Sequence, residues 1–187
     1  TVREVADEVG PDVLRFMMLT RKPEQPLDFD IEQVREQSKD NPVFYVQYAH
    51  ARCCSVIRNA NDMFDKSQLT DEALANVDLS ALVSGEERVV IRALVNWPRI
   101  VEQAAKAYEP HRIAFYVQDV AASFHSWWNA GKDDPEMRFL QEEDREKSLA
   151  RIALVRATAI TIASALNVIG VEAMQKLRND VNDVETG

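Results

Sequence analysis

The longest regular pattern of apolar and polar positions spans residues 41–58, and it predicts an amphipathic α-helix. Asn41 suits the N-cap and Pro42 the first helical position, where a missing N–H removes no hydrogen bond. At about 100° per residue, one side of this helix collects an apolar stripe, which we expect to face the core. The stripe contains Val43, Val46, His50, Cys53, Cys54 and Ile57.

Roughly opposite the apolar stripe, the same helix carries two aromatic rings and a cation. Tyr45, Tyr48 and Arg52, followed by Asn59, fall within about 60° of one another on the helical wheel. Periodicity alone favours the simpler interpretation, in which the tyrosines cover a neighbouring helix and Arg52 is solvated. The alternative is a surface that presents two aromatic planes and a guanidinium together to a ligand.

Start and break signals divide the rest of the chain into further helices. Capping boxes pair Thr1 with Glu4 and Ser84 with Glu87. The expected helices cover residues 1–9, 12–19, 31–37, 84 to a break at 96–98, 100–108, 111–130 and 145–169, with Gly170 as a left-handed C-terminal cap.

Two long segments lack clear periodicity. Residues 62–83 read as a surface excursion or a short weak helix, and residues 131–144 as an acidic loop that exposes one aromatic ring, Phe139. Residues 27–29 alternate like a short extended segment.

The apolar positions also predict which side chains turn inward. In the helix that begins at Ser84 we expect Val89, Val90, Ala93 and Leu94 to face the core. In the last helix the broad buried face includes Leu149, Ile152, Ala153, Val155, Ala159, Ile160, Ala163, Leu166 and Val168 or Ile169. The predicted fold class is therefore all-α, a helical bundle from Asn41 onward with residues 1–40 as a short helical connector.

Composition limits the chemistry. The chain has 187 residues, 46% of them hydrophobic, which suffices for a real core. Its five glycines lie too far apart for a glycine-rich phosphate loop. The net charge of −9 argues against a nucleic-acid partner, because phosphate binding is dominated by cations. Arginine supplies 15 of the 22 cations, however, and it suits stacking and forked hydrogen bonds.

The candidate catalytic and metal-binding residues lack suitable partners. Cys53 and Cys54 are adjacent, so we expect neither a disulfide framework nor a zinc site, but core residues of a cytoplasmic protein. His50 reads as a hydrogen-bonded core histidine, while His111 and His125 lie about 20 Å apart along one helix and cannot share an ion. No signal peptide or run of about eighteen apolar residues predicts a membrane location.

Several strings resemble a known family. Residues 40–52, DNPVFYVQYAHAR, resemble the opening of the C-terminal helical domain of arginyl-tRNA synthetases, which are class I aminoacyl-tRNA synthetases. Residues 9–16, 27–30, 109–112 and 124–129 resemble further family strings, although Trp127 and Trp128 stand where the family more often has Phe and Tyr. The C-terminal segment departs from the family pattern, which ends in Pro-Glu-x-Met.

The resemblance implies that residues 1–40 are the tail of a catalytic domain and that residues 41–187 form an α-helical anticodon-binding domain. The whole protein would join arginine to tRNA(Arg) with ATP and Mg²⁺. This chain, which begins at Thr1 rather than Met and lacks the ATP-holding signatures, is expected to be the inactive anticodon-binding part. The expected partners are tRNA(Arg) and, through the missing catalytic part, arginine and ATP, but neither DNA nor a membrane.

The family's anticodon-contacting residues match Tyr45, Tyr48 and Arg52 position by position. The resemblance also places Phe139 beside the anticodon loop, and Leu177 near the tyrosines in place of the family's terminal methionine. For Phe139 the alternative is a ring folded onto the bundle. Two other functions stay open: the related domain of cysteinyl-tRNA synthetase, and a non-enzymatic helical module that binds protein through the acidic loop and an exposed tryptophan.

Overall fold

The computed structural model describes residues 1–20 and 41–176, which contain helices and no strand. The elements in chain order are α1 (Val2–Val9), α2 (Pro11–Leu19), α4 (Pro42–Asn59), η1 (Ala60–Asp62), α5 (Asp71–Ala75), α6 (Gly85–Val95), α7 (Trp97–Ala107), α8 (His111–Asp133), η2 (Pro135–Met137) and α9 (Arg145–Val168). The predicted all-α fold is confirmed. The extended segment expected at 27–29, the helix expected at 31–37 and the boundary at residue 40 lie outside the described residues.

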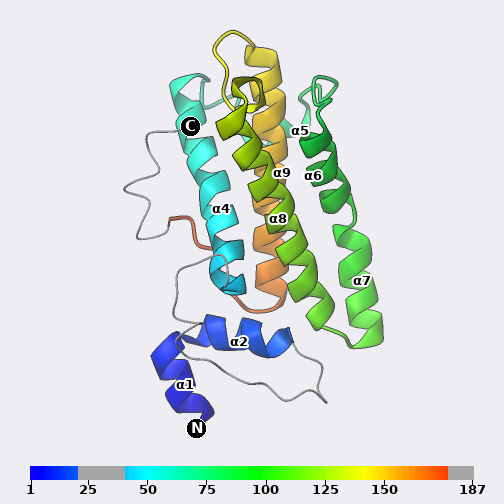
Figure 1. The fold of residues 1–187 in the computed structure, drawn as a ribbon. Helices are drawn as coiled ribbons and strands as arrows, with labels where there is room; N and C mark the ends of the chain where they lie inside the picture. The colour runs from blue at the N-terminus through cyan, green and yellow to red at the C-terminus, as the bar shows by residue number, and fades with distance from the viewer. Residues whose placement is uncertain (21–40, 177–187) are drawn as a thin grey trace.

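The long helices form an antiparallel bundle, shown in Figure 1. The chain ascends along α4, descends along α6 and α7, ascends again along α8 and returns along α9. The most extensive packing joins α4 to α9 and α6 to α8, while α8 also contacts α4, α7 and α9. The short helices α1 and α2 lie at one end of the bundle (Figure 1). Every long helix therefore buries an apolar face against at least one other helix.

The local signals in the sequence act as predicted. Both capping boxes form, and the Asn41 side chain accepts the backbone N–H groups of Val43 and Phe44 at 3.1 and 3.2 Å. The chain breaks between α6 and α7 at Asn96, just before Trp97 and Pro98. Gly170 has a φ of 71°, as its place after the last helix predicts.

One helix is longer than the sequence indicated, and one loop adopts the more ordered of its two predicted alternatives. The helix expected to end at residue 130 continues to Asp133. Within the predicted excursion 62–83, α5 is the short helix that was one of the two alternatives. This excursion buries Phe64 and Leu74 against Ile152 in a small second core. These apolar anchors at the start and in the middle of the excursion hold it on α9.

Some inward positions were predicted wrongly. Val89 is 50% exposed and Ile160 47%, whereas of the two alternatives Val168 and Ile169 it is Ile169 that is buried, with an exposure of 7%. In α6 the core position one turn from Val90 belongs to Glu87, which is fully buried. Charged residues are normally solvated, whereas the Glu87 carboxylate is paired inside the bundle with Arg151.

The helix α2 joins the main core. Phe16 is fully buried among the side chains of the bundle. The Asp12 carboxylate accepts the N–H of Glu172 at 2.8 Å, and Arg15 donates to the carbonyl of Gly170. By length and composition α9 would be able to cross a membrane, but 61% of its apolar window is buried, as in the core helix of a bundle.

Candidate functional site

The predicted stripe on α4 lies against α8 rather than facing open solvent. Tyr45, Tyr48 and Arg52 are each half-buried. Their neighbour across the helix interface is His125, whose ring centroid lies 4.4 Å from that of Tyr45 and 5.7 Å from that of Tyr48. Each of these side chains therefore has both a buried and an accessible part. The buried parts of the two tyrosines agree with the interpretation in which they cover a neighbouring helix.

Arg52 is held by hydrogen bonds and aromatic rings, so the expectation that it is simply solvated is wrong. Its Nη2 donates to the Tyr48 hydroxyl at 2.7 Å, and its Nη1 lies 3.2 Å from His125 Nδ1. The guanidinium carbon lies 3.9 Å from the Tyr48 ring centroid and 4.7 Å from that of Trp128. Cation–π attraction and hydrogen bonds together fix the guanidinium at the helix interface.

The two hydrogen bonds of His125 define its tautomer. Its Nε2 lies 3.1 Å from the Tyr45 carbonyl, which can only accept, so Nε2 carries the proton. Nδ1 is then free of a proton and accepts from Arg52. The pKa of His125 is lowered to about 4, mainly by burial and also by the charge of Arg52, against the opposing effect of the hydrogen bond to the Tyr45 carbonyl. His125 is therefore neutral at physiological pH and orients Arg52.

Sequence reasoning missed this role of His125. It compared His125 only with the other histidines, and the partner Arg52 lies 73 residues away on a different helix. Burial also raises the pKa of Tyr45, so its hydroxyl stays protonated.

Phe139 is half-buried, so the expectation of an exposed ring in the acidic loop is wrong. Its ring stacks on Phe124 at 5.8 Å and meets Trp127 edge-on at 4.5 Å and Trp128 at 5.7 Å between centroids. The alternative of a ring folded onto the bundle describes these contacts. No tryptophan among the described residues is exposed either, against the expectation behind the protein-binding module.

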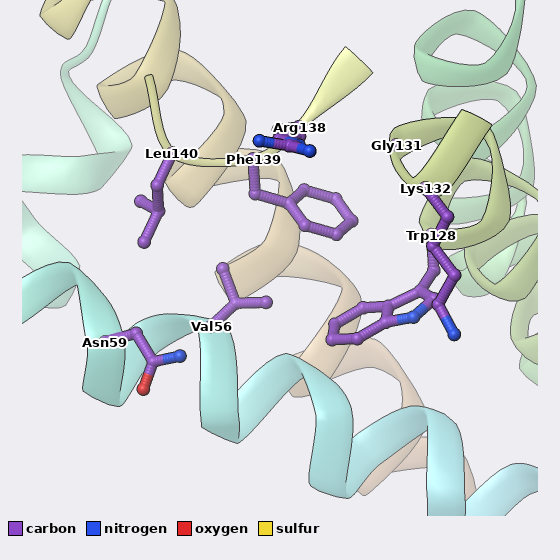
Figure 2. A pocket seen from close by; sticks show the side chains of 8 residues that line it. All are labelled: Val56, Asn59, Trp128, Gly131, Lys132, Arg138, Phe139 and Leu140. Atoms are coloured by element: carbon purple, nitrogen blue, oxygen red, sulfur yellow. The ribbon is translucent and has the colours of Figure 1, made fainter. Parts of the chain in front are cut away.

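A small pocket lies beside Phe139, between the ends of α4 and α8 (Figure 2). Its cavity volume is about 40 Å³, close to the space of one or two water molecules. The exposed cations Lys132 and Arg138 stand at this pocket. Its full lining comprises Val56, Asn59, Trp128, Gly131, Lys132, Arg138, Phe139 and Leu140. The pocket thus joins an apolar floor to two positive charges.

Leu177 lies outside the described residues, but the segment before it follows α4. Gln47 donates to the Glu172 carbonyl at 3.2 Å, His50 Nδ1 lies 2.8 Å from the Met174 carbonyl, and Arg58 donates to that of Gln175 at 3.2 Å. His50 is buried and hydrogen-bonded, as predicted, and burial lowers its pKa. By helical periodicity these α4 residues face away from the stripe of Tyr45 and Tyr48.

The described residues offer little other chemistry. No three His, Cys, Asp or Glu side chains in residues 1–20 and 41–176 lie close enough to hold a metal. Cys53 and Cys54 are free thiols, and burial raises the pKa of both. The arrangement around Arg52 therefore suits binding by stacking and charge.

Comparison with known protein families decides the assignment. The family model of the DALR anticodon binding domain matches residues 46–177. The chain belongs to the DALR anticodon binding domain family. The matched part of this DALR domain contains Tyr48, Arg52, Phe139 and Leu177, whereas Tyr45 precedes its first residue by one position.

Individual relatives of the DALR domain agree with this family. This chain is 55% identical over 179 residues to arginine–tRNA ligase of Rhodospirillum rubrum, and the match covers 95% of this chain and 30% of that protein. The corresponding protein of Parvibaculum lavamentivorans is 54% identical over 178 residues, with the same coverage. The chain thus spans about 30% of the length of these curated relatives.

A solved structure confirms the fold of the DALR domain. Arginyl-tRNA synthetase of Thermus thermophilus superposes with a TM-score of 0.74 at 28% identity, over 93% of this chain and 27% of that one. The resemblance to arginyl-tRNA synthetases is therefore confirmed. These relatives and this structure favour it over the alternative of a cysteinyl-tRNA synthetase domain.

Proposed function

We propose that this chain is the anticodon-binding part of an arginyl-tRNA synthetase and that it holds the anticodon loop of tRNA(Arg) on Tyr45, Tyr48 and Arg52. The observation that carries the proposal is the position of Arg52 between the Tyr48 and Trp128 rings, with its guanidinium oriented by His125. Aromatic planes beside a fixed cation suit unpaired RNA bases, which stack on rings and offer acceptor edges.

The electrostatics of the surface support an RNA partner despite the net charge of −9. Arg52, Lys132 and Arg138 place positive charge beside the aromatic cluster of α4, α8 and the loop after α8. Arg52 is half-buried, and a charge partly removed from water attracts an acceptor more strongly than a fully solvated one. Every arginine anticodon has cytosine in the middle, and its O2 and N3 are acceptors that a guanidinium can meet.

The stacking part of the surface centres on Tyr48. Its ring stacks with that of Phe44, with centroids 5.6 Å apart and planes inclined by 17°. Stacking of one base on an aromatic side chain contributes about 1–3 kcal/mol. Phe139 completes the proposed surface where it reaches the pocket beside Trp128, and only the family resemblance adds Leu177, which lies outside the described residues.

The activity of the whole protein is also part of the proposal. A catalytic part beyond this chain would join arginine to tRNA(Arg) with ATP and Mg²⁺, and residues 1–40 would connect it to the bundle. The chain alone is then expected to show no arginine-dependent pyrophosphate exchange. Exchange catalysed by the purified chain would contradict this division of labour.

Filter binding of tRNA(Arg) and tRNA(Cys) tests the binding role. The unmodified chain should prefer tRNA(Arg), and Tyr48→Ala should weaken that binding roughly ten- to a hundredfold, because one stacked base is lost. Tyr48→Phe keeps the ring and removes the hydroxyl that accepts from Arg52, so it should lose less affinity.

Two control variants lie away from the proposed surface. Tyr108→Ala removes a tyrosine that is 92% exposed after α7, and Arg99→Ala removes an exposed arginine on α7. Both should bind tRNA(Arg) as the unmodified chain does, with circular dichroism confirming intact helices throughout. Equal losses in the controls and in Tyr48→Ala would refute a localised surface.

A further inference from the structure

A buried ion pair joins the first turn of α6 to the second turn of α9. Arg151 on α9 has a side-chain exposure of 1% and Glu87 on α6 of 0%, and Arg151 Nε donates to Glu87 Oε1 at 2.7 Å. The other carboxylate oxygen of Glu87 accepts the N–H of Ser84 at 2.9 Å, closing the capping box of α6. The Glu87 carboxylate therefore caps the N-terminus of α6 and also pairs with the buried guanidinium of Arg151.

The opposite side of the Arg151 guanidinium holds the loop after α8. Nη1 donates to the carbonyl of Glu136 at 2.8 Å and to that of Arg138 at 2.6 Å. The Gln141 side chain donates to the same Glu136 carbonyl at 2.8 Å from the solvent side. Both Arg151 contacts are to main-chain atoms, so they fix the path of the loop whatever its side chains are.

This loop reaches the proposed RNA surface through an unbroken series of contacts. Phe139, which follows Arg138, packs on Trp128 with ring centroids 5.7 Å apart. Trp128 in turn lies under the guanidinium of Arg52 at 4.7 Å. Arg138, Phe139 and Trp128 line the same pocket (Figure 2).

We propose that Arg151 is a positioning residue for the RNA surface. Held by Glu87, it fixes the loop so that Phe139 and Arg138 stand beside Trp128 and Arg52; this inference rests on the proposed function. A buried ion pair generally stabilises a fold no more than well-packed apolar residues of the same volume do. The guanidinium fork, however, reaches a carboxylate on one edge and two carbonyls on the other, which neither Lys nor Met can do. Its role is therefore placement of the loop.

The test uses the double variant Glu87→Met/Arg151→Met, which removes both charges together and replaces them with apolar side chains. Hydrogen exchange of the amides in residues 134–141 should rise about tenfold or more, because the loop loses its core anchor. Affinity for tRNA(Arg), measured by filter binding, should fall about three- to tenfold, because a loop that is not held in place must be ordered on binding. Thermal melting confirms that the variant is folded.

A matched control removes another ion pair of the same helix. Arg156 on α9 donates to the Asp71 carboxylate of α5 at 2.6 and 3.0 Å, away from the loop. The variant Asp71→Met/Arg156→Met makes the same change in charge and should leave loop exchange and tRNA affinity unchanged. A general effect of lost charge would appear equally in both double variants.

A second perturbation displaces the loop without touching the ion pair. A Cβ added at Gly131 on α8 would lie 3.2 Å from the Met137 carbonyl oxygen, so in Gly131→Ala the loop backbone must shift by a few tenths of an ångström. It should raise loop exchange and lower tRNA affinity in the same direction as the double variant. If the double variant fails to fold, Gly131→Ala still tests the second half of the proposal, that the position of the loop matters for binding.

Two outcomes would overturn the proposal. In a folded double variant, unchanged exchange in residues 134–141 would show that Arg151 does not fix the loop. Faster exchange with unchanged tRNA affinity, in either variant, would show that the loop position does not matter for binding. If the unmodified chain fails to bind tRNA(Arg), the proposed function itself is wrong, and the exchange comparison still decides whether Arg151 holds the loop.

Discussion

The neutral state of His125 makes the stability of the bundle sensitive to acid. A solvated histidine has a pKa of about 6.5, whereas burial lowers the pKa of His125 to about 4 in the folded chain. Between these two values the unfolded chain binds a proton that the folded chain does not. The stability from neutral His125 is therefore complete above pH 6.5 and is lost progressively as the pH falls towards 4.

The size of this effect follows from the pKa difference. Between pH 7 and pH 5 the free energy of unfolding should fall by about 2 kcal/mol through His125, at about 1.4 kcal/mol per pH unit below 6.5. Replacing His125 by Leu removes the titrating group and should abolish this part of the loss. The variant should also lose stability of about 1–3 kcal/mol at neutral pH, since Arg52 loses a buried acceptor.

Urea unfolding of both proteins at pH 7 and pH 5 provides the comparison. The pKa of His50 is also lowered by burial, but His50 is present in both proteins, so its contribution cancels in the difference between them. Parallel loss of stability in the unmodified chain and in His125→Leu would refute the reasoning. A His125 ring signal that titrates near pH 6.5 in the folded chain, followed by NMR, would refute it directly.

Three further changes test the packing by urea unfolding. Glu87→Gln should lower the free energy of unfolding by about 3–5 kcal/mol, because it leaves the Arg151 charge buried without its counter-ion. A loss below about 1 kcal/mol would contradict an ion pair that is shielded from water. Gly170→Ala should lower the free energy of unfolding by about 1–2 kcal/mol, because Gly170 has a φ of 71°. Gly85→Ala, in open space at the start of α6, should raise it by up to about 1 kcal/mol. Equal effects of the two changes would contradict the assignment of Gly170 as the C-terminal cap of α9. Tyr108→Gly should gain about 1 kcal/mol, because this 92% exposed residue has a φ of 57°; a loss would reveal a packing role.

The local structure of α4 was predictable because its signals are close together in the sequence. Asn41 caps the helix, and offsets of three and four place Tyr45, Tyr48 and Arg52 together. The same periodicity placed these side chains opposite the core, whereas they lie at the edge of the interface with α8. Helical periodicity gives the direction of a side chain from its own helix, and it contains no information about which neighbour stands there.

The remaining features depend on contacts between distant segments. The pairing of His125 with Arg52 depends on the packing of α8 against α4, which the local sequence does not determine. Glu87 and Arg151, 64 residues apart, were unpredictable for a physical reason: a charged residue is normally solvated, so only the presence of its partner makes burial favourable. The burial of Phe139 was unpredictable for a similar reason, since the three aromatic rings that it packs against belong to a different element, α8.

The most direct test of the proposed binding surface is the affinity of the folded chain for the isolated anticodon stem-loop of tRNA(Arg), compared with Tyr48→Ala and Arg52→Ala. Both variants should bind at least about tenfold more weakly. In Arg52→Ala the dependence of affinity on salt should also fall if the guanidinium meets a phosphate, and the preference for cytosine over uridine in the middle position should fall if it meets a base. Affinity equal to that of the unmodified chain in both folded variants would contradict the account and leave Tyr48 and Arg52 as helix-packing residues.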